Sequence, residues 1–311
     1  MPGTYPPPAP TLSGDLLTIH RLLQSPTQIR RRLQTIRDLR FVADQMLTQR
    51  YRSSGGAVLY EVSEGIFTDR EVGPVAPGSE YPMANTDNGT AAMASVDNWG
   101  QATRLTDARI KRSRYAGQEL DRTLRKLMNA VIRKVDRLAI AAVAANVTQT
   151  VAATAPWADL DDATILRDIE RGKAVVTDLD FGYLPDSILM STTRYADFIS
   201  DDKINNLRRR EDTTNPVYTG TIERIANLAV LTTAASNLPT DDVWILDSTQ
   251  LGGMADETEL DPGYSVGDLG VQVQSERVAK ADRWDVWARR ITVPVICEPG
   301  AAIRITETDG S

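Results

Sequence analysis

The sequence predicts an α+β fold, and three features of the residue pattern lead to this class. Residues 53–104 lack helical periodicity, because glycine and proline recur through them, and an amphipathic stretch over 106–147 follows. Residues 156–269 alternate helical and strand patterns without the regular β-α-β period of a doubly wound sheet. From residue 270 onward strand patterns dominate. Together these features favour one long helix lying across a sheet, beside a mixed α and β region.

The composition is that of a folded protein without covalent cross-links of its own. Of the 311 residues, 41% are hydrophobic and 25% are charged, as in ordinary globular chains. The single cysteine, Cys297, excludes an internal disulfide, and its apolar surroundings predict a buried structural thiol. The start lacks a signal-peptide pattern, and the most apolar run, 138–145, is far shorter than the ~20 residues of a membrane span. We therefore expect a protein made in a cytoplasm, with no membrane partner.

The net charge of −7 is unevenly distributed along the chain. Residues 1–52 contain eight arginines and three aspartates, which gives this segment +5 and leaves −12 for the remainder. Such a division predicts a basic arm that contacts nucleic acid or the acidic body of a neighbouring molecule, although a solvated helix face would carry the same residues. No aromatic residues interleave with the arginines as in a base-stacking platform, so sequence-specific recognition of nucleic acid is not expected.

The first expected elements are a basic helix and an extended hairpin. Apolar residues at helical spacing over 27–51, with arginines opposite, predict an amphipathic helix that ends before the Ser-Ser-Gly-Gly run at 53–56. Residues 57–62 are predicted to form a strand, and 91–96 the return strand of a long hairpin. An extended segment of this length is anomalous inside a compact domain. We expect it to pack on other copies of the same chain.

The long helix is expected over 106–147, as ~40 residues spanning about 60 Å. Thr106 is the candidate N-cap, and Asp107 is favourable in the first turn. An apolar stripe recurs at spacings of three and four: Leu120, Leu124, Leu127, Val131, Val135, Leu138 and Ala142. Its register drifts, and its flanks are basic early and alanine-rich late, which favours packing on a sheet over a coiled coil.

The remaining elements follow from short apolar runs and from helical spacing between polar turns. The expected helices are 162–177 and 193–209, and the expected strands are 187–190, 227–232, 243–246, 270–275, 290–297 and 302–306.

Catalytic motifs are missing from the sequence. The one histidine, His20, cannot supply a triad or a histidine metal site, and no phosphate-binding glycine motif occurs. Acidic pairs such as Asp161/Asp162 fall in turns, where aspartate is common. The acidic cluster at 256–261 misses the EF-hand spacing, which leaves a calcium site as a minor alternative. We predict no catalytic residue, no cofactor and no metal.

The order of these elements resembles that of the major capsid proteins of tailed bacteriophages, the Hong Kong 97-type fold. Two stretches carry the resemblance. Val-Leu-Tyr-Glu-Val at 58–62 and Gly-Ser-Glu-Tyr-Pro at 78–82, followed by the helix from Thr106, are similar to the family's extension loop and spine helix. Residues 285–299 are similar to its closing strands, particularly in phages of actinobacteria.

The resemblance implies a domain organisation. Residues 1–52 would be the N-terminal arm and 53–104 the extension loop. Residues 105–155 and 270–311, with the spine helix at 106–147, would form the peripheral domain. Residues 156–269 would form the axial domain, whose loops gather at the centres of hexamers and pentamers.

The resemblance also implies a function. The chain would be a structural, non-enzymatic subunit that self-assembles into an icosahedral head shell in the virion, enclosing double-stranded DNA contacted without base recognition. The expected partners are other copies of the chain, a separate scaffolding protein, a portal and a decoration protein. The residues expected to make inter-subunit or inner-surface charge contacts are Arg30, Arg31, Arg32, Arg37, Arg40, Arg70 and Glu71.

Two other functions are compatible with the sequence, and one feature of the sequence differs from the type member of the family. An encapsulin shell shares the fold and encloses enzymes, and an acidic cytoplasmic hydrolase belongs to a different class of protein. The family's type member joins subunits through an extension-loop lysine, but the first lysine of this chain is Lys111. We therefore expect no lysine cross-link from the loop, and reinforcement by non-covalent contacts.

Overall fold

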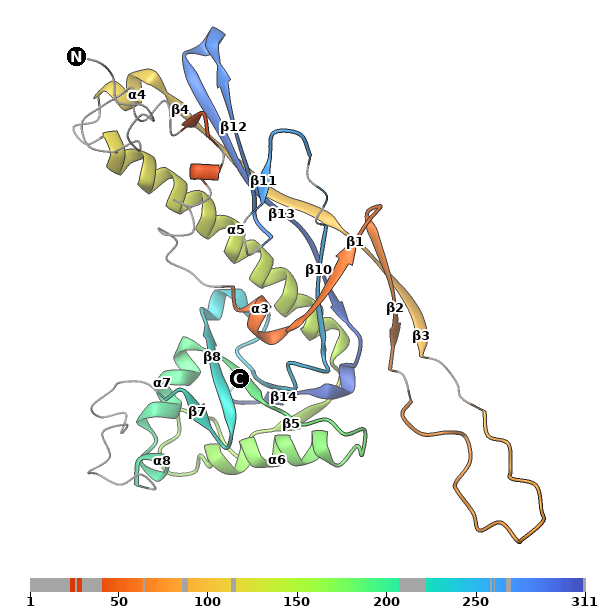
Figure 1. Cartoon of the computed structure of the whole chain (residues 1–311). Coiled ribbons are helices and arrows are strands. Elements are labelled where there is room, and N and C mark those ends of the chain that lie inside the picture. Colours follow the sequence, from red (N-terminus) through yellow and green to blue (C-terminus); the bar gives the residue numbers. More distant parts are fainter. Residues whose placement is uncertain are drawn as a thin grey trace, which may run out of the picture.

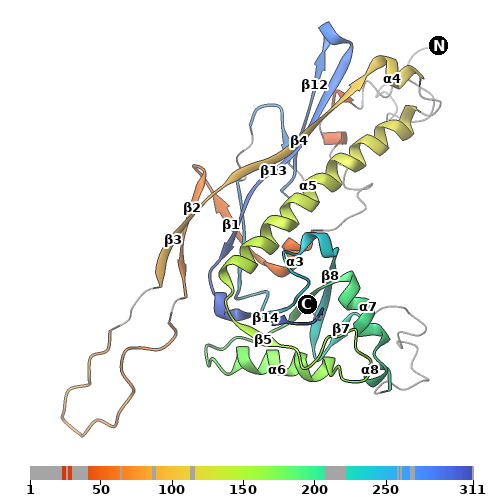
Figure 2. The same cartoon turned by 180° about the vertical axis from the view of Figure 1, so that it is seen from behind.

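The computed structural model shows an elongated molecule with two sheets, one long helix and a projecting hairpin (Figures 1 and 2). The residues it describes are 23–25, 27–29, 41–63, 65–85, 89–112, 116–206, 222–257, 259, 261–266 and 270–309. No helix in these ranges combines the length and apolar character that a membrane crossing requires.

The first sheet is organised around its longest strand, β13 (Arg283–Ile296). The other strands of this sheet are β1 (Gln49–Ser53), β4 (Asp97–Thr106), β10 (Gly252–Glu257), β11 (Ser265–Val266) and β12 (Gln272–Val278). Strand β13 pairs antiparallel with β4, β12 and β10, and β1 adds to β10 in parallel. Side chains of β13 alternate between buried and half-buried, because one face of the sheet carries the helix.

The second sheet has the order β5-β14-β9-β6-β8-β7 and draws its strands from distant parts of the chain. They are β5 (Thr150–Ala152), β6 (Ser187–Ser191), β7 (Arg224–Ile225), β8 (Leu228–Thr233), β9 (Val243–Leu246) and β14 (Ala302–Thr306). Helix α6 (Ile165–Thr177) packs on this sheet, and Gly172 gives it close contact with Ile245. The short helices α7 (Thr192–Ser200) and α8 (Asp202–Asn206) lie at one end (Figure 1).

The long helix lies along the first sheet, against β13 and β4. Helix α4 (Asp107–Arg112) precedes it, and α5 (Ala116–Asn146) has 31 residues. Leu124, Val131 and Val135 are buried, as the apolar stripe predicts. The N-cap is confirmed, because the backbone N–H of Arg109 donates to Thr106 Oγ1 at 3.3 Å. The single helix predicted over 106–147 is wrong at its start, since Thr106 ends β4 and the described helix covers 107–112 and 116–146.

The third sheet is the projecting hairpin of β2 (Ala57–Val62) and β3 (Thr90–Ser95). Both strands are confirmed within one residue of their expected bounds. The connection between them extends away from the body of the molecule (Figures 1 and 2). Residues 97–104, which we expected in the same segment, instead belong to β4 of the first sheet.

Several sequence predictions are corrected by tertiary pairing. The helix predicted over 27–51 is wrong at its end, because Gln49–Ser53 form strand β1, which pairs with β10. Exposed and less exposed residues alternate along this strand. The helix predicted over 193–209 is interrupted at Asp201, which is extended between α7 and α8. Strand β13 begins at Arg283 rather than 290, because β4 and β12 pair with its first half.

Membership of the two large sheets does not follow the expected boundaries at residues 156 and 270. Strands β5 and β14, on the outer sides of these boundaries, join the sheet of β6, β8 and β9. Strand β10, between them, joins the sheet of β13. The chain therefore crosses between the two sheets several times.

Close approach of β1 to β10 depends on a glycine. A Cβ placed on Gly253 would lie 2.3 Å from the backbone oxygen of Gln49. Replacing Gly253 with alanine should therefore lower the free energy of unfolding by about 1–3 kcal/mol, as overpacking does elsewhere. Urea unfolding measures this, with Gly73→Ala as control, because nothing lies within 4 Å of a Cβ at that position. Equal stability of both variants would contradict the assigned pairing.

Candidate assembly surfaces

The projecting hairpin presents large apolar side chains to solvent. Val72 is 100% exposed, Met83 89% and Tyr81 80%. The other large apolar residues exposed on the hairpin and its connection are Leu59, Ile66, Phe67 and Met93. Large apolar side chains exposed together on one segment are typical of a site of contact with another molecule. We name residues 57–95 the projecting loop, and its exposed apolar side chains are the main candidate site.

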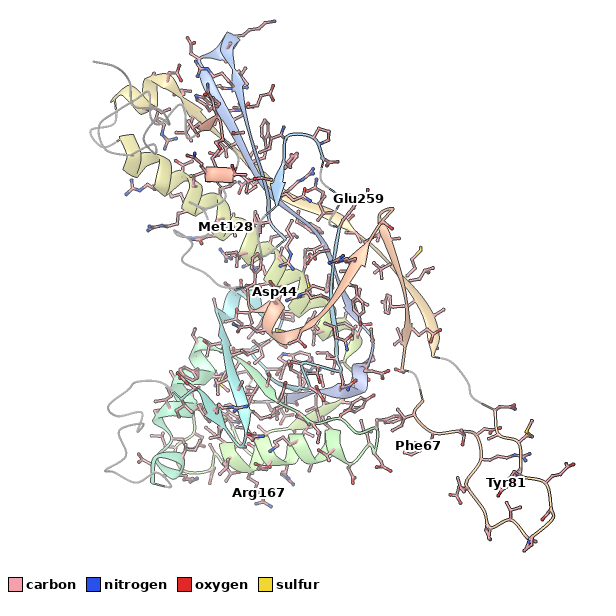
Figure 3. The ribbon with its side chains drawn as sticks, viewed as in Figure 1. Asp44, Phe67, Tyr81, Met128, Arg167 and Glu259 are labelled. Carbon is pink, nitrogen blue, oxygen red and sulfur yellow. The ribbon has the colours of Figure 1, made fainter. Side chains whose placement is uncertain are left out.

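Contacts at its base give the projecting loop a defined shape. The backbone N–H of Asn85 donates to Asp69 Oδ1 at 2.8 Å, which joins the two sides of the connection. The ring of Phe67 lies 6.5 Å from that of Phe181, and Phe181 stacks on Tyr183 at 5.7 Å. Figure 3 shows Phe67 near the body of the molecule and Tyr81 farther out. The base therefore rests on the region of the second sheet, while the outer part stays uncovered.

A second site lies inside the molecule, where one buried arginine joins three segments. Arg290 of β13 is 1% exposed. Its guanidinium donates to both carboxylate oxygens of Asp44, at 3.1 and 3.0 Å, and to both of Asp256, at 2.9 and 3.0 Å. The ring of Phe41 lies 4.9 Å away. Burial opposes the charge, but the two carboxylates outweigh it and raise the pKa of Arg290 above its usual value.

The long helix joins this site through Asp136. Its Oδ1 accepts a hydrogen bond from the backbone N–H of Ala43 at 2.9 Å, at the start of α3 (Ala43–Met46). Burial, with a further contribution from the charge of Asp44, raises the pKa of Asp136 to about 6. The segment before β1 is therefore fixed to α5, β10 and β13 at one point, near the centre of Figure 3 where Asp44 is labelled.

A family model described as "Phage capsid protein" matches residues 89–305, more than half of the chain. The chain belongs to the phage capsid protein family. It is a structural subunit of the shell of a phage head. No curated protein matches the sequence.

Solved structures agree with this capsid fold at low sequence identity. The capsid structure of cyanophage P-SCSP1u matches with a TM-score of 0.58 and 12% identity, covering 84% of this chain and 86% of that one. A chain of Mycobacterium phage Che8 matches at 0.57 and 12% identity, covering 86% and 92%. A virus-like particle from Pyrococcus furiosus matches at 0.56 and 12%, covering 90% and 98%. The α+β, Hong Kong 97-like fold expected from the element order is thereby confirmed.

The charged residues proposed from the sequence fall into two groups. Arg30, Arg31, Arg32, Arg37 and Arg40 lie outside the described residues of this capsid protein. Arg70 and Glu71 lie on the projecting loop and are exposed. The ion pairs between described residues include neither of them.

Other residues singled out in the sequence have structural contacts. Asp256 binds Arg290, and Asp261 binds Arg289. Among the described residues, no group of three or more histidine, cysteine or acidic side chains is arranged to hold a metal ion. Cys297 is half-buried rather than buried, and its Sγ lies 3.3 Å from the hydroxyl of Tyr51. The role of Arg290 was not predicted. The sequence signal for such a role is an arginine at a strand position whose side chain faces the protein interior.

Removing the buried cation should destabilise the capsid subunit strongly. Arg290→Met removes the buried guanidinium between two half-buried carboxylates, leaving Asp256 without this cation and Asp44 with Arg50 alone, so we expect the free energy of unfolding to fall by up to about 3–5 kcal/mol. Urea unfolding of the full chain measures the loss. Arg52→Met, at an exposed position of the adjoining β1, is the matched control and should change stability by less than about 1 kcal/mol. Similar effects of the two changes would refute the assigned role.

The buried carboxyl of Asp136 should make stability depend on pH. Its pKa rises from 3.8 in the unfolded chain to about 6, so the folded chain binds this proton more tightly. The stabilising contribution is complete below about pH 4 and is lost as the pH rises through about 6. Asp136→Asn, which retains an acceptor for Ala43, should therefore raise stability at pH 7.5 by roughly 1–3 kcal/mol.

The same variant should have little advantage at pH 4, where Asp136 of the unchanged chain is already protonated. Urea unfolding at both pH values gives the comparison. Asp162→Asn, at an exposed site, is the control and should show no such difference between the two pH values. If the free energies of unfolding of Asp136→Asn and of the unchanged chain differed by the same amount at pH 4 and at pH 7.5, Asp136 would not titrate between these pH values.

Proposed function

We propose that this capsid protein self-assembles into hexamers and pentamers of a closed icosahedral shell around double-stranded DNA, and that the projecting loop packs on a neighbouring copy. The main support is the exposed apolar surface of Val72, Tyr81 and Met83. Burying such a side chain is worth about 1.5–3 kcal/mol. In a symmetric shell every subunit makes the same loop contact with its neighbour. The modest free energy of one contact is therefore multiplied around the ring.

Within this proposal each part of the chain has a place. Residues 1–52 act as the N-terminal arm and 53–104 as the extension loop. Residues 105–155 and 270–311 form most of the peripheral domain, and 156–269 form most of the axial domain at the capsomer centres, with β5 and β14 added to the axial sheet and β10 to the peripheral one. The arginines of the arm, together with Arg70 and Glu71, make contacts between subunits or with the inner surface.

The proposed partners follow from the same assembly. A separate scaffolding protein guides the shell, a portal occupies one vertex, and a decoration protein reinforces the outside in place of lysine cross-links. Synthesis takes place in the cytoplasm of a bacterial host. A cargo-enclosing encapsulin would share the fold, but the family match favours the phage shell.

Polar substitution of the outer loop should prevent assembly without unfolding the subunit. We expect the triple variant Val72→Ser, Tyr81→Ser and Met83→Ser to form far fewer closed particles than the unchanged chain, while its thermal midpoint changes little, because these side chains are exposed. Negative-stain electron microscopy and light scattering of the purified chain measure particle formation.

The matched control replaces apolar residues that are exposed outside the projecting loop. Leu160 and Leu184 are each 73% exposed, and Leu160→Ser with Leu184→Ser should leave particle formation closer to normal. Normal particles from the loop variant would count against the proposed contact. Absence of particles from the unchanged chain, even with a co-expressed scaffold, would count against the assembly itself.

A further inference from the structure

One face of the long helix carries a regular line of positive charge. Arg122, Lys126, Arg133 and Arg137 follow one another at intervals of four, seven and four residues, which places them on one side of α5 over about four turns. We name these four residues the basic stripe. It is about 22 Å long at the usual rise per residue. Arg122, Lys126 and Arg133 are exposed, and Arg137 is half-buried.

The described residues do not neutralise this charge with carboxylates. Arg133 Nη2 donates to Ser236 Oγ at 3.3 Å, and Arg137 donates to Asn237 Oδ1 at 3.0 Å and to the backbone oxygen of Ser236 at 2.9 Å, all neutral acceptors. No described ion pair involves a residue of the stripe. Between 122 and 146 the one acidic residue is Asp136, which is 4% exposed and faces Ala43.

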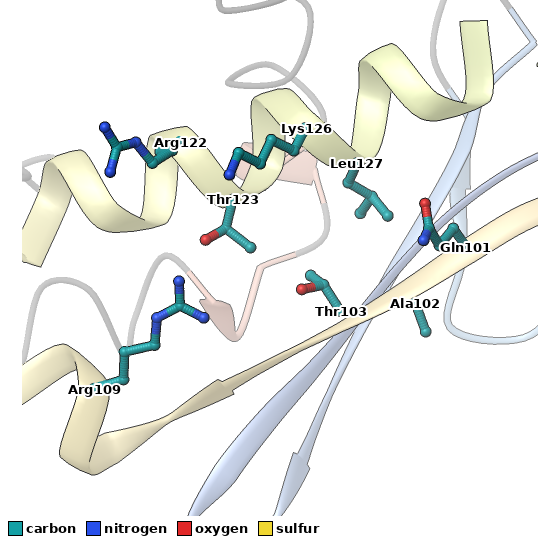
Figure 4. A pocket seen from close by; sticks show the side chains of 8 residues that line it. All are labelled: Gln101, Ala102, Thr103, Arg109, Arg122, Thr123, Lys126 and Leu127. Carbon is teal, nitrogen blue, oxygen red and sulfur yellow. The ribbon is translucent and has the colours of Figure 1, made fainter. Parts of the chain in front are cut away.

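One end of the stripe opens into a pocket between α5 and β4 (Figure 4). Arg122 and Lys126 line it from the helix, and Arg109 faces them from α4. Thr103, Thr123 and Gln101 add hydroxyl and amide groups, and the described side chains that line the pocket include no carboxylate. The pocket therefore brings together positive charge, to which Arg122 and Lys126 of the stripe contribute directly. Phosphate oxygens, which accept hydrogen bonds and carry negative charge, match this set.

We propose that the basic stripe and the pocket beside it bind the phosphates of duplex DNA without reading sequence. This rests on the proposed function, since a DNA-filled shell brings the ligand to the subunit. Duplex DNA carries one negative charge per about 1.7 Å of its axis, so a line of cations about 22 Å long meets many phosphates. The chain as a whole has a net charge of −7, whereas the four residues of the stripe are all cations.

The test measures how DNA binding by the full-length chain depends on salt. Fluorescence anisotropy with a labelled duplex of arbitrary sequence gives the affinity between about 50 and 200 mM NaCl. The stripe variant carries Arg122→Gln, Lys126→Gln, Arg133→Gln and Arg137→Gln. The control variant changes four exposed cations elsewhere, two of them also four residues apart on a helix: Arg167→Gln, Arg171→Gln, Arg224→Gln and Lys280→Gln.

We expect the stripe variant to reduce the slope of log affinity against log salt by about 3–4, since each phosphate contact contributes about 0.9. The control should change it by less than about 1. A shorter variant, Arg122→Gln with Lys126→Gln, avoids the bonds to Ser236 and Asn237 and should reduce the slope by about 2. Thermal midpoints of all variants show that the fold is retained.

Two results would overturn the proposal. The first is an equal loss of DNA affinity in the stripe and control variants, or no loss in either. The second is tighter binding of polyglutamate than of the duplex at the same salt, which would assign the stripe to an acidic segment of a protein. Electron microscopy of the same preparations separates this question from assembly, because a stripe variant that forms normal particles leaves the shell function intact.

Discussion

The buried guanidinium of Arg290 is the interaction on which the arrangement of the subunit depends. It satisfies two carboxylates that come from opposite ends of the sequence, Asp44 and Asp256, while sitting in the longest strand of the first sheet. An ion pair at such a depth adds little net stability compared with apolar packing, but it strongly penalises any arrangement that separates its members. The site therefore specifies where the segment before β1 must lie.

The contacts that fix the fold lie inside the subunit, and the side chains that we propose for assembly lie on its outside. The polar groups around Arg290 are satisfied within one chain, whereas the projecting loop exposes side chains that one chain cannot cover. The hydrogen bond between Asn85 and Asp69, and the contact of Phe67 with Phe181, hold the loop in shape before any partner arrives. A preorganised loop loses less conformational entropy on contact than a disordered segment would.

The sequence predicted elements whose signals are local. Residues 57–62 and 91–96 were predicted as the two strands of the hairpin, and short apolar runs predicted β6 and β9. Strands β1 and β10 were missed, since Gly252 and Gly253 have low strand propensity and both strands exist through pairing with each other and with β13. Glycines and prolines predicted that no helix forms between β2 and β3, but the carboxylate partners of Arg290 depend on tertiary structure that no local pattern contains.

The pairing of β1 with β10 also has a consequence for synthesis. Thr48 bonds to the backbone oxygen of Ser248, 200 residues later, and β10 in turn needs β13 near the end of the chain. Contacts so distant in sequence form slowly and only after most of the chain has left the ribosome. The projecting loop is made early, yet the sheet that orients it closes late. Within the proposed function, the projecting loop therefore takes its final orientation only after nearly the whole chain has been made.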